Sequence, residues 1–221
     1  MRKDPLHVVY MVGAHSTGKT TLSRWVRDHY GLPMISEVAR GVLAEMEEHL
    51  DSLRSNIDLV NRYQREVFLR QIETEAQQEG GFVSDRAFCN LAYAAHHAEI
   101  MHDLAGDPVL GEYMEKVKQG IVFFIRPHRE LLAADGVRER VDWEDVVRID
   151  GMVKLLLEMF GVSYIPVASL SMQERVRLIQ RVLSLSGLEQ IEGKETDPTS
   201  VMVSTEDDQR GRRVGQESSP Y

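Results

Sequence analysis

The stretch Gly13–Thr20, GAHSTGKT, decides the fold of this chain. It fits the spacing G-x-x-x-x-G-K-[ST], follows the apolar run HVVYMV at 7–12 and leads into the helical pattern KTTLSRWVRDHY at 19–30. A strand, a glycine-bearing loop and a helix in this order are typical of a loop that binds the phosphates of a nucleoside triphosphate. Gly13 and Gly18 let the backbone curl so that successive N–H groups point at phosphate oxygens.

Each part of the loop has an expected role. The helix that begins at the end of the loop adds the positive end of its dipole. Lys19 supplies a charge to the β- and γ-phosphates, and the Thr20 hydroxyl can bind Mg²⁺. The sequence therefore predicts ATP and Mg²⁺ as ligands. The predicted nucleotide contacts are Gly13, Ala14, His15, Ser16, Thr17, Gly18, Lys19, Thr20 and Thr21.

The rest of the chain alternates short apolar runs with longer helical patterns. The predicted strands are 7–12, 33–36, 81–85, 120–125 and 163–167, and the predicted helices are 18–30, 38–50, 57–79, 87–103, 110–118, 142–160 and 171–186. Apolar runs without alternation are typical of strands covered on both faces, and strands separated by helices indicate a parallel sheet. The predicted fold class is α/β, a P-loop sandwich of about five parallel strands resembling the NMP kinases.

The composition of the chain indicates its domain limits and excludes some classes of protein. Residues 1–187 are predicted to form the P-loop domain, and the polar segment 188–221 a disordered tail. The single cysteine, Cys89, fits a reducing cytoplasm and reads as a small buried hydrophobe. No apolar run reaches the roughly 18 residues that a membrane span needs. A net charge of −9 argues against nucleic-acid binding by bulk electrostatics, without excluding a local basic groove.

Asp85 ends the third predicted strand, at 81–85, and Arg86 follows it. A carboxylate at this edge could hold Mg²⁺, or could instead cap the next helix. P-loop ATPases commonly place Glu after this Asp, to orient the attacking water. Arg86 cannot act as a base, but it can bind an anionic acceptor or a phosphoryl group in transfer. This pair favours transfer over hydrolysis.

Glu37 and Arg40 follow the second predicted strand, at 33–36, and share one helix face. Glu37 could accept a proton from an attacking hydroxyl or hold the acceptor, and Arg40 could bind the acceptor; the alternative is an ordinary surface ion pair at a helix start. A GTPase would carry Asn-Lys-x-Asp after a late strand, and neither RPHREL at 126–131 nor ASLSMQ at 168–173 contains it. The GTPase reading is therefore weak.

Four arginines crowd into the segment after the fourth predicted strand: Arg126, Arg129, Arg138 and Arg140. A helical lid bearing arginines would stabilise charge on the transferring phosphoryl group and exclude water. The alternative is a solvated helix pair whose arginines face nearby glutamates. We expect Arg138 and Arg140 to take part in catalysis, as lid residues.

Together, GAHSTGKTTL at 13–22, SEVAR at 36–40, the Gln/Glu-rich helix at 61–79, FVSDRAFCNLAY at 82–93 and DGVRER at 135–140 resemble P-loop kinases. The resemblance is to the group of nicotinamide riboside kinases and phage kinase-like proteins and, more distantly, to thymidylate and deoxynucleoside kinases. It covers about residues 7–186. It implies that Glu37 contacts or deprotonates the acceptor, that Asp85 and Arg86 form the Asp-Arg pair, and that Arg138 and Arg140 are lid arginines.

The resemblance leaves the acceptor open. One phage branch phosphorylates 5-hydroxymethyluracil within DNA, a step in thymine hypermodification, and such an enzyme must reach a flipped-out or unpaired base. Modified DNA of this kind is the first candidate acceptor, and nicotinamide riboside or a (deoxy)nucleoside or nucleotide is the second. The first candidate would place the protein in the cytoplasm of a phage host. A nucleotide-dependent binding module or regulatory ATPase is the alternative of another class.

Overall fold

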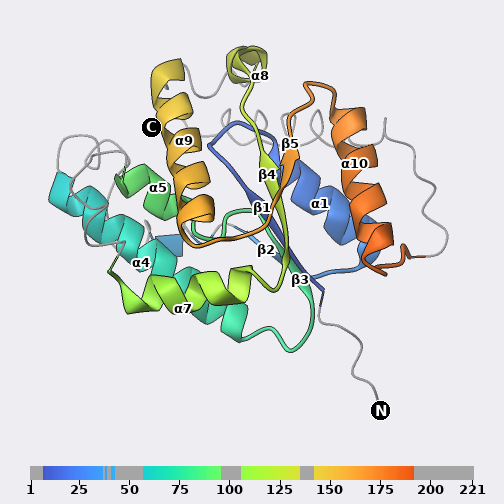
Figure 1. Ribbon diagram of the computed structural model, residues 1–221, viewed down its shortest axis with the longest axis horizontal. Helices are drawn as coiled ribbons and strands as arrows, with labels where there is room; N and C mark the ends of the chain where they lie inside the picture. Colours follow the sequence, from blue (N-terminus) through green and yellow to red (C-terminus); the bar gives the residue numbers. More distant parts are fainter. Residues whose placement is uncertain are drawn as a thin grey trace, which may run out of the picture.

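The computed structural model describes residues 7–36, 38, 41–42, 57–95, 106–134 and 142–191. Its strands form one parallel sheet in the order β2-β3-β1-β4-β5 (Figure 1). Every predicted strand is present, and the predicted α/β fold class is confirmed. The strands are β1 (Val8–Val12), β2 (Met34–Ile35), β3 (Phe82–Ser84), β4 (Ile121–Ile125) and β5 (Ile165–Val167).

Helices connect the strands, as a parallel sheet requires. The predicted helix at 38–50 lies mostly outside the described residues, and the one at 87–103 is described only up to residue 95. The helices are α1 (Lys19–Tyr30), α4 (Ile57–Ala76), α5 (Cys89–Ala95), α7 (Pro108–Val117), α8 (Arg129–Ala134), α9 (Trp143–Met159) and α10 (Met172–Leu185).

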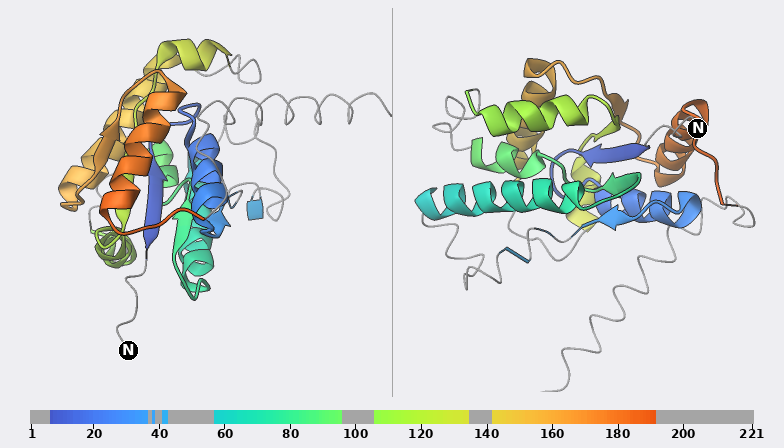
Figure 2. Two further views of the ribbon diagram at one scale, coloured as in Figure 1. Left: turned by 90° about the vertical axis from the view of Figure 1, so that its right-hand side faces the viewer. Right: turned by 90° about the horizontal axis from the view of Figure 1, so that it is seen from below.

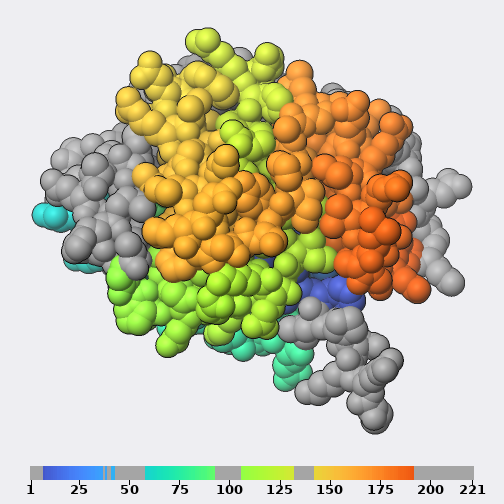
Figure 3. All heavy atoms as spheres, viewed as in Figure 1, coloured from blue at the N-terminus to red at the C-terminus, as the bar shows by residue number. Residues whose placement is uncertain are grey.

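The sheet separates two hydrophobic clusters because successive side chains of a strand point to opposite faces. Val9 and Met11 of β1 face the cluster that α1 and α10 complete, whereas Tyr10 and Val12 face the cluster built with α4, α5, α7 and α9. In the view from below, α1 and α10 lie on one side of the sheet and α4 and α7 on the other (Figure 2). Side chains of α7, α9 and α10 occupy most of the face shown in Figure 3.

The first residues after α10 run back along the end of α1. The Ile191 N–H donates to the His29 carbonyl across 2.9 Å, and a Cβ at Gly31 would lie 3.0 Å from the Ile191 side chain. Residues 188–191 therefore pack against the domain, and residues 192–221 lie outside the described part. No helix among the described residues is both long and apolar enough to cross a membrane.

Candidate active site

All five strands end at one edge of the sheet, where the phosphate loop follows β1. Gly13 adopts φ +145°, and a Cβ there would lie 2.4 Å from the Ile125 carbonyl oxygen of β4. Ser16 and Gly18 also have positive φ, at +55° and +88°. The loop thus passes so close to β4 that only glycine fits at 13.

Side chains of the loop bind its own backbone. The Thr17 hydroxyl donates to the Ala14 carbonyl at 2.9 Å, and the Lys19 ammonium group donates to the same carbonyl. Lys19 Nζ lies 3.5 Å from Thr17 Oγ1. These bonds hold the Lys19 charge beside the loop amides, at the N-terminus of α1, where an anion is stabilised.

Cys89 lies under the loop. It is buried, as the sequence predicted, and its sulfur accepts a hydrogen bond of 3.3 Å from the Gly13 N–H. Burial raises the pKa of the thiol. The first residue of α5 therefore holds the first residue of the phosphate loop.

Thr20 and Asp85 meet across the edge of the sheet. The Thr20 hydroxyl donates to Asp85 Oδ2 at 2.8 Å. Asp85 is buried, and among the described residues its Oδ1 has no hydrogen-bond partner. A hydroxyl and a carboxylate with one unused oxygen are hard ligands of the kind that Mg²⁺ prefers, so these residues fit the predicted metal. The alternative role of Asp85 as a helix cap is not seen, since α5 begins only at Cys89.

Arg86 follows in a tight turn that Ser84 organises. The Ser84 hydroxyl oxygen accepts from the Ala87 N–H at 3.2 Å, and Ala87 has φ +51°. Arg86 Nε is buried and has no hydrogen-bond partner within the described part of the chain. The Arg86 charge also lowers the pKa of Tyr63 on α4, although burial raises that pKa by more. The turn thus presents a guanidinium beside α4.

A partly buried polar network supports this turn from α4. Gln71 Nε2 donates to Ser84 Oγ at 3.1 Å and to Glu75 Oε1 at 2.7 Å. Glu75 also accepts from the Tyr10 hydroxyl at 3.1 Å and from the Tyr113 hydroxyl at 2.8 Å. Burial raises the pKa of Glu75, and the three donors oppose that rise. The network ties α4, β1 and α7 to the end of β3.

On the other side of the loop, Arg126 follows β4 and pairs with Asp150 of α9 at 2.8 Å. Asp150 is only 4% exposed. Burial raises its pKa to about 6, although the positive charges of Arg126, Lys154 and Lys19 oppose this rise. A buried acid thus lies within electrostatic reach of the loop lysine.

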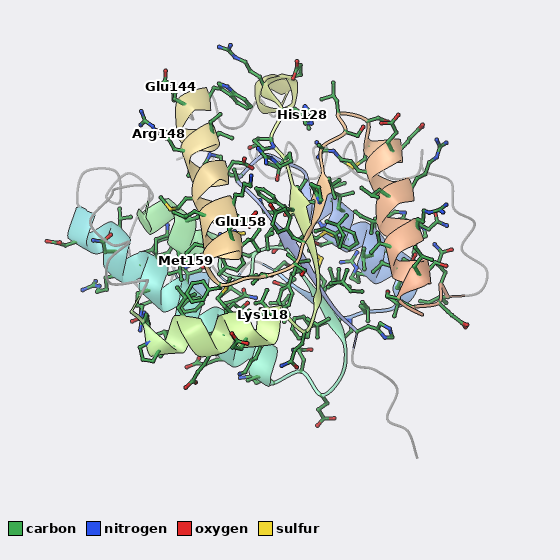
Figure 4. All side chains as sticks on the ribbon, in the orientation of Figure 1. Lys118, His128, Glu144, Arg148, Glu158 and Met159 are labelled. Carbon is green, nitrogen blue, oxygen red and sulfur yellow. The ribbon has the colours of Figure 1, made fainter. Side chains whose placement is uncertain are left out.

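The segments after β4 and β5 lie side by side at this edge. The Arg126 N–H donates to the Val167 carbonyl at 3.0 Å, and His128 Nε2 lies 2.8 Å from the Ala168 carbonyl oxygen. Figure 4 places His128 beside α8, whereas Glu144 and Arg148 lie at the start of α9. Arg126 therefore lies where the segment after β4 contacts the segment after β5.

Arg175 enters the site from α10. Its side chain is fully buried and donates through Nη1 to the Thr17 carbonyl at 2.5 Å, through Nε to the Ser169 carbonyl, and through Nη2 to the Arg126 carbonyl at 3.5 Å. Burial lowers its pKa. One guanidinium thus contacts the segments that follow β1, β4 and β5.

The structure brings together only part of the predicted site. Gly13 to Thr21, Asp85 and Arg86 all lie at the carboxyl edge of the sheet, whereas four predicted residues lie outside the described part: Glu37, Arg40, Arg138 and Arg140. The described residues contain no group of three or more His, Cys, Asp or Glu side chains arranged to hold a metal. The acceptor and lid roles therefore stay predictions.

Sequence reasoning missed Asp150 and Arg175. Both stand in the apolar stripe of an amphipathic helix: Asp150 between Val146 and Val153 of α9, and Arg175 beside Val176 of α10. A charged residue on such a stripe is buried in the fold and needs partners there. That position was the signal that could have found them.

Comparison with known proteins agrees with this fold. A family model described as "AAA domain" matches residues 8–175. Among solved structures, the NadR protein in complex with NR aligns with TM-score 0.61 and 20% identity over 86% of this chain, which spans only 54% of the NadR chain. Deoxyadenosine kinase from M. mycoides with bound dATP aligns with TM-score 0.55 and 13% identity over 80% of this chain and 99% of that one.

Shikimate kinase from Aquifex aeolicus vf5 aligns with TM-score 0.50 and 14% identity over 81% of this chain and 98% of that one. No curated protein sequence matches. At these identities the structural likeness concerns the fold, and the predicted resemblance to P-loop kinases is confirmed at that level. Because the family model spans most of the chain, from β1 to the first turn of α10, the protein belongs to the AAA domain family of P-loop proteins.

Proposed function

We propose that the protein is a kinase that transfers the γ-phosphate of ATP to a hydroxyl group of a nucleoside-type acceptor. The observation that supports this most is the Thr20–Asp85 hydrogen bond with Arg86 directly after it. Thr20 and Asp85 would hold Mg²⁺, which when bound neutralises phosphate charge. Lys19 and the loop amides bind the triphosphate.

Transfer rather than hydrolysis is supported by the residue after Asp85. A guanidinium stays protonated and cannot take a proton from water, but its fork of donors suits phosphoryl oxygens. Arg86 Nε is buried and has no hydrogen-bond partner among the described residues. We assign Arg86, Arg138 and Arg140 to charge stabilisation on the transferring group. We assign Glu37, Arg40 and also Arg86 to binding of the acceptor.

A nucleoside-type acceptor is supported by the solved structures that share this fold, one named as a deoxyadenosine kinase and one as NadR in complex with NR. The finer proposal is 5-hydroxymethyluracil within DNA, on the resemblance of the motifs to phage kinases. Free nicotinamide riboside or a (deoxy)nucleoside or nucleotide is the competing acceptor. The net charge of −9 lends no support to the DNA acceptor.

The test is transfer of ³²P from γ-labelled ATP with Mg²⁺. The acceptors are 5-hydroxymethyluracil DNA in single- and double-stranded form, the matched thymine DNA, nicotinamide riboside, and free nucleosides and nucleotides. The DNA proposal expects label on hydroxymethyluracil DNA and none on thymine DNA. Label on free acceptors alone would remove the DNA proposal and keep the kinase.

A control separates the kinase from a regulatory ATPase. ATP consumption that no acceptor changes would contradict the kinase. The Lys19→Ala variant should lose transfer, because Lys19 supplies charge to phosphate, and it should unfold like the wild type in denaturant. Full transfer activity in folded Lys19→Ala would show that the phosphate loop is not the ATP site.

A further inference from the structure

Arg175 is a buried cation in the first turn of α10, close to the phosphate loop. It is 0% exposed, and it is the largest fully buried side chain among the described residues. Its neighbours on the same face of α10, Val176 and Ile179, belong to the hydrophobic core. An isolated guanidinium in such surroundings carries a large desolvation cost, so its partners decide what it does.

Those partners are carbonyl oxygens of Thr17, Arg126 and Ser169. Each carbonyl lies in a segment that follows a different strand, so the planar guanidinium fixes three backbone segments relative to one another. A backbone contact of this kind positions the chain itself and does not depend on the side chains at 17, 126 or 169. Arg175 therefore links the phosphate loop to the segment after β4 and to the segment after β5.

The bond to Thr17 also acts on the loop's own donors. The Thr17 carbonyl belongs to the same peptide unit as the Gly18 N–H, and a donor on the carbonyl polarises that N–H toward greater acidity. Gly18 is a loop residue of the phosphate-binding spacing, with φ +88°. A better Gly18 donor binds a phosphate oxygen more tightly.

Charge adds to this effect. Within the described residues Arg175 has no carboxylate at ion-pair distance; its hydrogen bonds go only to carbonyls. The guanidinium keeps its proton even though burial lowers its pKa, so it places a positive charge against the loop with no ion-pair partner among those residues. In this poorly hydrated setting the charge attracts a bound polyphosphate more strongly than a surface charge would.

We propose that Arg175 is a positioning residue that strengthens triphosphate binding, by bracing the phosphate loop against the segments after β4 and β5 and by placing a buried positive charge behind its amides. The proposal rests on the proposed function only for the identity of the ligand, a nucleoside triphosphate. It assigns Arg175 no contact with the reacting atoms.

Two variants of the full-length chain separate charge from bracing. Arg175→Gln keeps an N–H₂ donor but removes the charge, and Arg175→Lys keeps the charge but loses the planar fork. Arg177→Gln is the matched control, because Arg177 lies on the same helix with its side chain exposed. Binding of ATP, ADP, AMP and inorganic pyrophosphate is measured by calorimetry without acceptor, and stability by denaturant unfolding.

We expect Arg175→Gln to bind ATP about tenfold or more weakly, the size of a lost charge-assisted bond. The loss should shrink from ATP to ADP to AMP, since the attraction grows with phosphate charge. Arg175→Lys should bind ATP more tightly than Arg175→Gln, and Arg177→Gln should match the wild type. A purely structural role would instead weaken all ligands in proportion to lost stability.

Folded Arg175→Gln with wild-type affinity for ATP and pyrophosphate would overturn the proposal. If Arg175→Gln does not fold, Arg175→Lys decides: equal losses for ATP and AMP would overturn it, and a larger loss for ATP would support it. A wild-type protein that binds neither ATP nor pyrophosphate would overturn the proposed function first and this inference with it. Binding without transfer to any acceptor would leave the inference standing and remove the kinase.

Discussion

The hydroxyl of Thr20 lies 2.8 Å from Oδ2 of Asp85, and this hydrogen bond joins the first turn of α1 to the end of β3. The other oxygen of Asp85 is buried and has no partner among the described residues. An unpaired buried carboxylate oxygen is costly unless a ligand takes it up. The pair therefore fits the magnesium site that we propose.

Replacing Thr20 tests this site. Thr20→Val removes the hydroxyl at similar volume and should raise the Mg²⁺ concentration for half-maximal phosphate transfer by about 10–100-fold. Thr20→Ser keeps the hydroxyl and should stay close to the wild type. A magnesium titration of transfer checks both variants. Unchanged magnesium dependence in Thr20→Val would remove Thr20 from the metal site.

Gly13 tests the close approach of the loop to β4. Gly13→Ala would place a Cβ 2.4 Å from the Ile125 carbonyl oxygen, and the shift needed to relieve this should lower the free energy of unfolding by about 2–4 kcal/mol. Gly151→Ala is the control, because nothing lies within 4 Å of its Cβ in α9. That control should gain about 0.5–1 kcal/mol. Denaturant unfolding measures both, and a neutral Gly13→Ala would contradict the packing.

Ser84 tests the turn that carries Arg86. Ser84→Ala leaves the Ala87 N–H and one Gln71 N–H without their acceptor, and should cost about 1–3 kcal/mol of stability. Because the turn presents Arg86, KM for the acceptor should rise more than KM for ATP. Steady-state kinetics with each substrate varied checks this. Thr74→Ala is a control, since the Thr74 hydroxyl donates to the Arg70 carbonyl within α4 at an exposed site. Equal KM changes for both substrates would contradict the expected role.

The raised pKa of Asp150 should make the stability of the protein depend on pH. Its pKa is raised to about 6 in the fold, so the protonated form is favoured and stability falls as pH rises through that value. Asp150→Asn lacks this titration. As the pH rises from roughly 4 to 7, the free energy of unfolding of Asp150→Asn should therefore increase relative to that of the wild type by up to about 3 kcal/mol. The pKa of about 6 already includes the opposing effect of the facing charges of Arg126, Lys154 and Lys19.

The measurement is denaturant unfolding of both proteins across that range. The pKa of Glu75 is also raised, but Glu75 is present in both the wild type and Asp150→Asn. Its effect therefore cancels in the difference between their free energies of unfolding. A difference between the two proteins that stays constant with pH would contradict the assignment to Asp150. Arg177→Gln, an exposed change on another helix, is a suitable control for nonspecific charge effects.

Much of the fold, and the place of the loop and Asp85 at the carboxyl edge of the sheet, could be predicted because the information is local. The phosphate loop is a contiguous pattern, and Asp85 stands at the end of an apolar run, where parallel strands place ligand-binding groups. Asp150 and Arg175 follow a different logic. Their partners lie in other segments, as when Arg175 contacts Thr17 across 158 positions of sequence, and no local pattern encodes such a contact.

The network around Glu75 shows the same limit. Its acid lies in a charged stretch of α4 that is typical of a surface helix, yet Tyr10 and Tyr113 reach it from β1 and α7. Only the packing of three elements brings this glutamate into contact with both tyrosine hydroxyls. Cys89 is intermediate: its burial follows from composition, but its bond to the Gly13 N–H does not.

The guanidinium of Arg175 also sets an order of events during protein synthesis. The loop at 13–18 is made first, but Arg175, which braces it, is added 158 positions after Thr17. Until α10 has emerged and docked, the loop lacks its buried positive charge and its tie to the segments after β4 and β5. On this proposal a nascent chain gains its full affinity for nucleotide only once α10 has been made and has docked, so that nucleotide favours the folded domain over its incomplete forms.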